Sequence, residues 1–480
     1  MNKWHAVIGL EIHVQLLTQT KLFSRAPTRY GAKPNSQAYI VDLAMPGALP
    51  VLNQHALDLA IRFGLGVNAS INQLISFDRK NYFYPDLPKG YQITQHYHPI
   101  VIGGYINIPH HDTDKKIRLH HAHLEEDAGK SIHDYTDDMT GVDFNRAGTP
   151  LLEIVSEPDL RTPDEAVKFL KKLHTLVVSM GISDGNMQEG SFRCDVNVSL
   201  RPNANAPFGQ RVEIKNLNSF RFIEKAIHYE IKRQADVLDA GGIIKQETRL
   251  FNEHTQKTVM MREKEQAHDY RYHKDPDIPY VVISDDRIDN IRTHMPELPD
   301  QKATRYKKQL NLKADDADIF ANDINLSHYF DKLCAESSLE PQQVANWLLG
   351  PVSALINKHK GHEPIEDLVS IKHQTELLQA ITAGTISHSA GKLVLEDIWA
   401  SNKSPQSVIE AKSLTQIQDE TVISSIVQKV IDQNPKQLAQ YQSGSDKLFG
   451  FFVGQIMKES KGKAAPEVVN RLLRAKLNEH

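Results

Sequence analysis

The feature that most constrains the fold is a strict alternation of apolar and polar residues near the N-terminus, VIGLEIHVQL at residues 7–16. Apolar side chains at every second position are typical of a β-strand with one face in a hydrophobic core. The opposite face carries Glu11 and His13, which on a strand lie roughly 7 Å apart on one side. The pattern therefore predicts a strand that presents a carboxylate and an imidazole from one rigid surface.

A second alternating stretch, RCDVNVSLR at residues 193–201, is followed by a loop rich in Asn, Pro and Gly and then by RVEIKN at residues 211–216. Two alternating runs on either side of turn residues predict a β-hairpin. Its polar face offers Asp195 and Glu213.

A third acidic group follows three histidines within residues 117–130, where Glu125 and Glu126 are adjacent and are interpreted as one polar face. Carboxylates on rigid strands suit Mg²⁺, and an imidazole among them leaves Mn²⁺ possible. Like charges pack together unfavourably unless a cation neutralises them, so the three faces predict a divalent-metal site if they converge. Ordinary solvated strand faces are the alternative, because spacing alone does not show convergence.

Residues 78–95 mix cations, aromatic residues, prolines and a glycine, which is not the pattern of a core element. The segment predicts an ordered surface loop, and cations beside exposed aromatic rings also suit contacts with phosphates, bases or ribose. The chain has no phosphate loop of the Gly-x-x-x-x-Gly-Lys-Ser/Thr type and no dinucleotide fingerprint. If the chain binds a nucleotide, it therefore uses a less common mode of nucleotide binding.

The composition excludes several classes of protein. Cys194 and Cys334 are the only cysteines and lie far apart, which excludes a disulfide framework and a thiolate zinc site. A formal net charge of −4 does not fit a protein that coats itself in nucleic acid, although it allows a local basic patch. No apolar run reaches the ~20 residues of a membrane span, and without a signal-peptide pattern the cytoplasm is the expected compartment.

The chain of 480 residues predicts two to four domains at about 150 residues each. Residues 1–293 combine short strands with helices, expected from about His55, from Pro163 and over residues 221–240, and predict an α+β domain with a mixed or antiparallel sheet. Two all-α domains are expected to follow, one over residues 294–405 and a small one over residues 406–480.

Seven motifs in the same order resemble those of one protein family, the B subunits of the bacterial aspartyl/glutamyl-tRNA(Asn/Gln) amidotransferases. The motifs are VIGLEIHVQL (7–16), MPGALPVLN (45–53), RKNYFYPDLPKGYQITQ (79–95), HLEEDAGK (123–130), RCDVNVSLR (193–201), EIKNLNSF (213–220) and DYRY (269–272). The resemblance covers essentially the whole chain. It implies a catalytic cradle over residues 1–293 that binds ATP, Mg²⁺ and the acceptor end of a mischarged tRNA, with the helical and tail domains holding the tRNA body.

The resemblance also implies the reaction. The chain would phosphorylate the side-chain carboxylate of Glu-tRNA(Gln) or Asp-tRNA(Asn). Ammonia, released from glutamine by a separate amidase A subunit, would then displace the phosphate, and a small C subunit would tie A to B in a heterotrimer. Such an enzyme is an ATP-dependent carbon–nitrogen ligase with glutamine as amido donor.

The resemblance assigns roles to particular residues of the chain. The metal ligands it implies are Glu11, His13, Glu125, Glu126, Asp195 and Glu213. The catalytic residues it implies are Glu126, Lys80 and Lys89, and the nucleotide contacts are Arg146 and Thr149. The two lysines fall in the segment that the family places beside the active site and the ammonia entrance.

Many members of the family carry paired cysteine motifs that bind zinc. The matching positions here are Ser24, Ala26, Tyr39 and Asp42. Because none of them is a thiolate, no zinc is expected, and the loop is expected to be stabilised by packing alone.

Two other classes of protein stay open at this point. A tRNA-holding scaffold would use the carboxylates structurally. A free-standing metal-dependent hydrolase would turn over without tRNA or a partner. The choice between Glu-tRNA(Gln) and Asp-tRNA(Asn) depends on which tRNAs the host mischarges.

Overall fold

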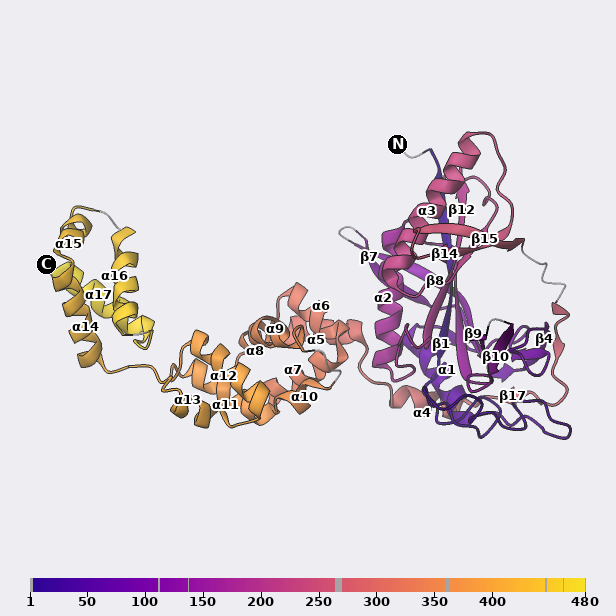
Figure 1. Cartoon of the computed structure of the whole chain (residues 1–480), viewed down its shortest axis with the longest axis horizontal. Coiled ribbons are helices and arrows are strands. Elements are labelled where there is room, and N and C mark those ends of the chain that lie inside the picture. Colours follow the sequence, from indigo (N-terminus) through magenta and orange to yellow (C-terminus); the bar gives the residue numbers. More distant parts are fainter. Residues whose placement is uncertain are drawn as a thin grey trace. The chain divides into compact units, whose positions relative to one another are not determined.

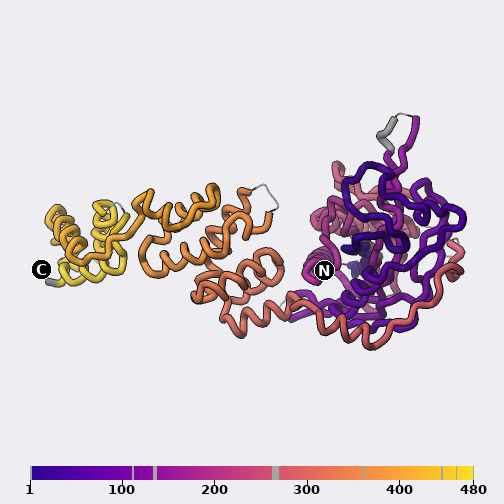
Figure 2. The backbone as a smooth tube through the Cα atoms, turned by 90° about the horizontal axis from the view of Figure 1, so that it is seen from below, coloured from indigo at the N-terminus to yellow at the C-terminus, as the bar shows by residue number. Residues whose placement is uncertain are grey.

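The structure, a computed structural model, describes residues 3–110, 113–136, 138–263, 270–359, 363–444, 447–460 and 462–479. The chain divides into two compact units, Met1–Pro299 and Asp300–His480, and each is described by itself (Figure 1). The predicted order of a sheet-containing domain followed by a helical region is confirmed (Figure 2). Asp269, the first residue of the DYRY motif, lies outside the described residues.

The first unit is built on a sheet to which ten described strands contribute. In spatial order these are β15 (Lys257–Glu263), β14 (Glu247–Asn252), β13 (Val212–Lys215), β12 (Phe192–Arg201), β1 (His5–Gln15), β11 (Pro150–Ser156), β8 (Thr113–Glu126), β6 (Val101–Ile102) and β2 (Ser70–Ile71), with β7 (Tyr105–His110) also pairing with β8. The pair β13 and β14 is parallel and the other described pairs are antiparallel, so the sheet is mixed, as predicted. Two small strand pairs lie beside it, β3 (Leu74–Ile75) with β17 (Val281–Val282) and β9 (Lys130–Thr136) with β10 (Met139–Asp143).

Strand β1 lies in the middle of the sheet and has one apolar and one polar face. Its alternate apolar residues are at most 1% exposed: Ile8, Leu10, Ile12 and Val14. They share one hydrophobic core with residues of three helices, α1 (Gln54–Gly66), α2 (Pro163–Ser179) and α3 (Phe220–Asp239). Burying each such side chain contributes about 1.5–3 kcal/mol. This core determines which side of the strand is left for polar residues.

The three helices begin where the sequence predicts because each has a capping side chain. Asn53 caps α1, Thr162 caps α2 and Ser219 caps α3, each accepting a hydrogen bond from an N–H group of the first turn. A fourth helix, α4 (Asp285–Thr293), packs against α1. The helices predicted near His55, from Pro163 and over residues 221–240 are therefore confirmed.

Residues 78–95 contain strands where the sequence predicts an irregular loop. β4 (Asp78–Asn81) and β5 (Tyr91–Thr94) pair antiparallel, and β16 (His273–Lys274) pairs with β4. The loop prediction is confirmed for residues 82–90 and is wrong for the strands on either side. Side-chain amides also join this small sheet to β8. The Gln92 amide donates to the Glu126 carbonyl oxygen at 2.7 Å, and Gln95 Oε1 accepts the Leu124 N–H at 3.0 Å. Composition does not reveal such tertiary hydrogen bonds.

A buried ion pair holds the loop that contains the positions matching the family's zinc ligands. Lys21 Nζ lies 3.1 Å from Asp42 Oδ2, and both side chains are at most 2% exposed. Lys21 also donates to the Phe144 carbonyl oxygen at 3.2 Å, and Asp42 accepts the Tyr39 N–H at 2.9 Å. The prediction that packing alone stabilises this loop is therefore wrong.

The second unit is helical, as predicted, and contains two hydrophobic clusters. The first is formed by α5 (Pro299–Gln309), α6 (Ala314–Asn322), α7 (Ile324–Ser337), α8 (Pro341–Trp347), a π-helical turn (Leu348–Val352), α9 (Ser353–Ile356), α10 (Ile365–Leu368), α11 (Ile371–Thr382), α12 (His388–Ser401) and α13 (Pro405–Ala411). The second is formed by α14 (Glu420–Gln433), α15 (Pro435–Gln442), α16 (Lys447–Glu459) and α17 (Pro466–Glu479). Val408 and Ile409 of α13 belong to the first cluster. The domain boundaries at residues 293 and 405 stay predictions.

Among the helices that the structure describes, none is long and apolar enough to cross a membrane.

Candidate functional site

The polar face of the central sheet gathers most of the predicted site residues. Directly opposed residues of antiparallel neighbours point to the same side of a sheet. Glu11 lies opposite Asp195, and His13 lies opposite Glu153. The predicted hairpin of β12 and β13 is confirmed, with Glu213 opposite Asn197. The acidic residues of the separate strands therefore converge on one face.

A cavity of about 640 Å³ opens on this face. Its lining combines carboxylates, histidines, tyrosines and lysines. The charged and polar side chains that line it include Glu11, His13, Lys80, Gln95, His123, Glu125, Glu153, Asp195, Glu213, Lys215 and Thr248. A cavity of this size suits a small-molecule group, and its charged lining favours a polar ligand over an apolar one.

Three residues in the cavity have the spacing of a metal site, and we call them the His13–Glu125–Glu153 centre. One ligand atom from each lies within 4.8 Å of the other two. His13 Nε2 is 3.3 Å from Glu153 Oε2 and 3.7 Å from Glu125 Oε1. An imidazole and two carboxylates at this spacing suit a hard divalent cation such as Mg²⁺ or Mn²⁺.

His13 offsets part of the negative charge within the centre. Burial opposes protonation of His13, but its hydrogen bond to Glu153 and the charges of Glu153, Glu125 and Asp195 outweigh burial and raise its pKa to about 9. Burial also opposes ionisation of Glu153, and the charge of His123 together with the hydrogen bond and charge of His13 holds the Glu153 pKa well below its usual range. A histidine must be neutral to bind a metal. A divalent cation would therefore replace the His13 proton, and the donor set fits such an ion.

The other carboxylates predicted as metal ligands on this face surround a lysine. The ammonium group of Lys215 donates a hydrogen bond to Asp195 and lies 3.4 Å from Glu213 Oε1. Glu11 accepts a hydrogen bond from Asn197 Nδ2 at 2.9 Å. Burial opposes protonation of Lys215, but the charges of Asp195, Glu213 and Glu11 outweigh it and raise the lysine pKa. An internal cation thus neutralises part of this acidic group.

Glu126 does not share a face with Glu125, so the interpretation of the two as one acidic face is wrong. Adjacent residues on a strand point to opposite sides. Glu126 instead pairs with Lys89 at 2.6 Å, with side chains 4% and 8% exposed. Lys80 does line the cavity, with its ammonium group 4.9 Å from the centre of the Tyr270 ring. The catalytic roles of Glu126, Lys80 and Lys89 stay predictions.

Arg146 and Thr149, the expected nucleotide contacts, are not among the described residues that line this cavity. Arg146 donates from Nε to the Ala128 carbonyl oxygen at 3.0 Å and from Nη2 to the Gly129 carbonyl oxygen at 2.6 Å. Its guanidinium group therefore holds the turn that follows β8. Thr149 is 5% exposed. Their contact with a nucleotide stays a prediction.

Sequence reasoning missed Glu153, His123 and Lys215 as members of the site. Glu153 interrupts the apolar run LLEIV at residues 151–155, and a lone carboxylate in a buried strand signals a bound partner. His123 stands two positions before Glu125, on the same side of β8, with its Nε2 3.6 Å from Glu125 Oε2. Period-two alternation could have identified both residues.

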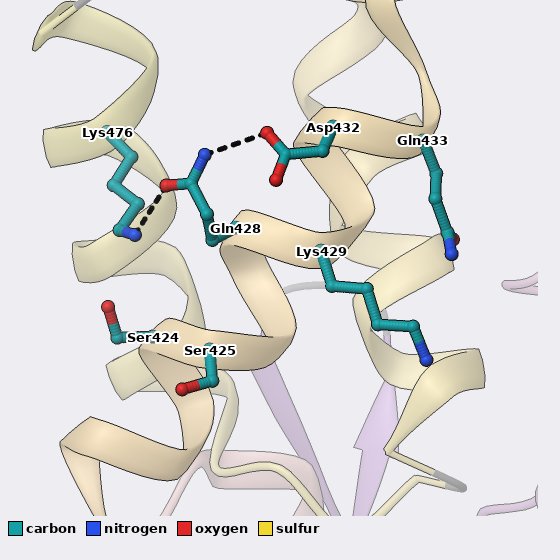
Figure 3. A pocket seen from close by; sticks show the side chains of 7 residues that line it. All are labelled: Ser424, Ser425, Gln428, Lys429, Asp432, Gln433 and Lys476. Atoms are coloured by element: carbon teal, nitrogen blue, oxygen red, sulfur yellow. Dashed lines mark hydrogen bonds between the residues drawn. The ribbon is translucent and has the colours of Figure 1, made fainter.

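A second hollow, of about 560 Å³, lies on α14 and α17 (Figure 3). Gln428 accepts a hydrogen bond from Lys476 at 2.6 Å and donates one to Asp432 at 2.9 Å. Lys429 pairs with Glu459. Because these polar groups pair with one another, the cavity on the sheet is the stronger candidate for chemistry.

Comparison with known proteins covers both units of the chain. The family described as GatB/GatE catalytic domain matches residues 6–289, and the one described as GatB domain matches residues 328–477. Three relatives are named as the B subunit of an aspartyl/glutamyl-tRNA(Asn/Gln) amidotransferase. Those of Coxiella burnetii (strain CbuG_Q212) and Halorhodospira halophila (strain DSM 244 / SL1) are 50% and 51% identical over 477 residues, which are 99% of this chain and 100% and 99% of the relatives. That of Geotalea uraniireducens (strain Rf4) is 50% identical over 480 residues, 99% of this chain and 100% of the relative.

Proposed function

The chain belongs to the GatB family of amidotransferase subunits, and on this premise we propose that it uses ATP to phosphorylate the side-chain carboxylate of Glu-tRNA(Gln), Asp-tRNA(Asn) or both. Ammonia derived from glutamine then converts the activated carboxyl group into the amide. The products are Gln-tRNA(Gln) and Asn-tRNA(Asn).

The observation that carries the proposal is the His13–Glu125–Glu153 centre, set in a cavity that Lys80 and Lys215 also line. A divalent cation bound there, Mg²⁺ or alternatively Mn²⁺, would neutralise charge on a phosphoryl group in transfer. In phosphoryl transfer, the protein contributes mainly by positioning the reactants and stabilising charge, and it does not need to supply a nucleophile. A carboxylate substrate is already ionised at neutral pH, so the first step needs no general base.

The charges that line the cavity also predict that nucleotide binding depends on the divalent cation. Carboxylates outnumber lysines among the residues that line the cavity. Such a wall repels an anionic nucleotide unless an added cation offsets the charge. Nucleotide binding itself, and not turnover alone, is therefore expected to need the divalent ion.

The partners we propose are an amidase A subunit, which releases ammonia, and a small C subunit that joins A to B. Within this chain, Glu126, Lys80 and Lys89 remain proposed catalytic residues and Arg146 and Thr149 proposed nucleotide contacts. Lys89 and Glu126 form a buried pair, and Glu126 points away from the centre, which argues against phosphate binding by this pair. For Lys89 we propose a place beside the ammonia entrance, as the family resemblance implies. The compartment we propose for this reaction is the cytoplasm.

We expect ADP release by the complex of this chain with its A and C partners to require both a mischarged tRNA and Mg²⁺. The tRNA supplies the carboxylate that is phosphorylated, and EDTA removes the cation. The measurement is ADP release from ATP with Glu-tRNA(Gln), with Asp-tRNA(Asn) and with no tRNA, each in Mg²⁺ and in EDTA. The tRNA that stimulates release identifies the substrate.

Two outcomes of this assay would favour the other classes of protein. Equal ADP release without tRNA would support a metal-dependent hydrolase. No release with either tRNA, despite normal tRNA binding, would support a scaffold.

We propose that α14 to α17 contact the phosphates of the tRNA, so removing residues 415–480 is expected to weaken tRNA binding by at least about tenfold. This truncation keeps α13, whose Val408 and Ile409 belong to the first helical cluster. The measurements are the tRNA dissociation constant at fixed salt and the ADP release rate at saturating tRNA. Since the His13–Glu125–Glu153 centre is retained, ADP release is expected to persist. An unchanged dissociation constant would remove the tail from tRNA binding.

A further inference from the structure

Gln95 places a side-chain amide beside the His13–Glu125–Glu153 centre. It directly follows β5, lines the cavity and is 1% exposed. Its Oε1 accepts the N–H of Leu124, the residue between His123 and Glu125 on β8, at 3.0 Å. Because only the oxygen of the amide can accept this hydrogen bond, the orientation of the amide is determined and Nε2 is the end left to donate.

The Nε2 group of Gln95 is a buried donor with no acceptor in the part of the chain that the structure describes. Leaving such a group unpaired costs about 1–3 kcal/mol, and native proteins rarely do so without a use for it. Two other neutral donors of the cavity are engaged. The Thr94 hydroxyl donates to Glu125 at 3.5 Å and the Thr248 hydroxyl donates to Glu213 at 2.8 Å. Gln95 therefore offers a donor that a bound group can use.

Two other buried glutamines have unpaired amide atoms but lie elsewhere, so the place of Gln95 in the cavity is what distinguishes it. Gln234 and Gln374 also carry amide atoms without a partner among the described residues. Neither of them is among the residues that line the cavity. Gln95 combines the unpaired donor with a place beside the centre.

A neutral donor shielded from water suits an oxygen that becomes charged only during the reaction. A phosphate is charged throughout, and cations match that charge. The carbonyl oxygen of an acyl phosphate gains its charge when ammonia adds to the carbon. Preorganised amide donors aimed at such an oxygen stabilise the transition state because they need no reorganisation.

We propose that Gln95 Nε2 donates a hydrogen bond to the carbonyl oxygen of the activated side-chain carboxyl group and stabilises the oxyanion formed on addition of ammonia. The ammonia nitrogen bonds to the carboxyl carbon, and the carbonyl electron pair moves onto the oxygen. Return of that pair breaks the bond from the carbon to the phosphate oxygen. Phosphate leaves with one proton of the ammonia, and the amide remains. The inference rests on the proposed function and makes Gln95 a catalytic residue of the amidation step.

Two substitutions isolate the donor. Gln95→Glu keeps an oxygen that accepts the Leu124 N–H but adds a negative charge near Glu125. Gln95→Met adds no charge but leaves the Leu124 N–H unpaired. The change that the two variants share is loss of the N–H donor. Gln374→Glu, on α11 in the second unit, is the matched control for burying a carboxylate in place of an amide.

The assay uses the complex with the A and C partners and measures ADP release, amide formed on the tRNA, and acyl phosphate trapped by hydroxylamine. In both Gln95 variants we expect amide formation to fall about 100-fold, while trapped acyl phosphate rises. In Gln95→Met, which adds no charge to the cavity, the KM for ATP is expected to stay unchanged. Gln374→Glu is expected to keep the wild-type ratio of amide to ADP. A purely structural role of Gln95 would not lower amide formation while acyl phosphate formation continues.

Three results would overturn the inference. Wild-type amide formation in Gln95→Glu at high pH, where the new carboxyl group is ionised and has no O–H to donate, together with loss in Gln95→Met, would show that Gln95 only supports Leu124. A raised KM for ATP with ADP and amide falling together would assign the donor to the nucleotide. Amide formation at the wild-type rate in both variants would remove Gln95 from catalysis. Failure of the proposed function is distinct, because the wild-type complex would then show no tRNA-dependent ADP release.

Discussion

Replacing Glu153 by glutamine is expected to lower tRNA-dependent ADP release by about 10³-fold, which corresponds to about 4 kcal/mol of transition-state stabilisation. The substitution keeps the size of the side chain and removes one of the two carboxylates of the His13–Glu125–Glu153 centre. It also places an amide N–H₂ group where His13 Nε2 now lies 3.3 Å from a carboxylate oxygen. The measurements are ADP release by the assembled complex and binding of Mn²⁺ to this chain, followed by electron paramagnetic resonance. We expect the Mn²⁺ affinity to fall at least about tenfold.

The matched control is Glu157→Gln, because Glu157 is likewise half-buried, lies just after β11 and does not line the cavity. We expect that variant to keep wild-type Mn²⁺ affinity and ADP release. Wild-type Mn²⁺ binding in Glu153→Gln would exclude Glu153 as a ligand. Lost Mn²⁺ binding with undiminished ADP release would separate the cation from the chemistry and contradict the proposed mechanism.

The elements of the first unit were predictable because their signals are local. The alternation in residues 7–16 defined the apolar and polar sides of β1, and Pro163 marked the start of α2. By the same rule of alternation Glu125 and Glu126 had to point to opposite sides of a strand. The single acidic face assumed for them was therefore an error in applying a local rule.

What the sequence could not show was the pairing of distant strands. Glu153 joins the centre because β11 lies next to β1 with His13 opposite it, and this register depends on the whole core. The hairpin of β12 and β13 was predictable, but its register, which brings Lys215 to Asp195, was not. Gln95 meets Leu124 across two sheets. These contacts join residues that lie 20 or more positions apart, and neither composition nor periodicity shows which of those residues come together.

Replacing Lys21 by methionine is expected to reduce the free energy of unfolding of the first unit by about 3–5 kcal/mol, because it leaves the Asp42 carboxylate buried without a counter-charge. Burial lowers the pKa of Lys21, and the charge of Asp42 opposes this effect. The charged form of Lys21 therefore depends on Asp42. Gly148, at φ +85°, leaves room for the pair, since a Cβ there would lie 3.0 Å from Asp42 Oδ1. The measurement is calorimetric unfolding of the full chain, with the transition of the first unit assigned by hydrogen exchange of peptides from α1.

The double variant Lys21→Met with Asp42→Asn tests the cause of this loss. An asparagine keeps an oxygen that accepts the Tyr39 N–H, which Asp42 now accepts at 2.9 Å, and carries no charge. Replacing both partners of a buried pair is often close to neutral, so we expect the double variant to recover most of the lost stability. As a control, Lys3→Met breaks an exposed pair with Asp239, with side chains 69% and 50% exposed, and is expected to leave the free energy of unfolding nearly unchanged. If the double variant were as unstable as Lys21→Met alone, the packing of the lysine stem, rather than its charge, would hold this loop in place of the family's zinc.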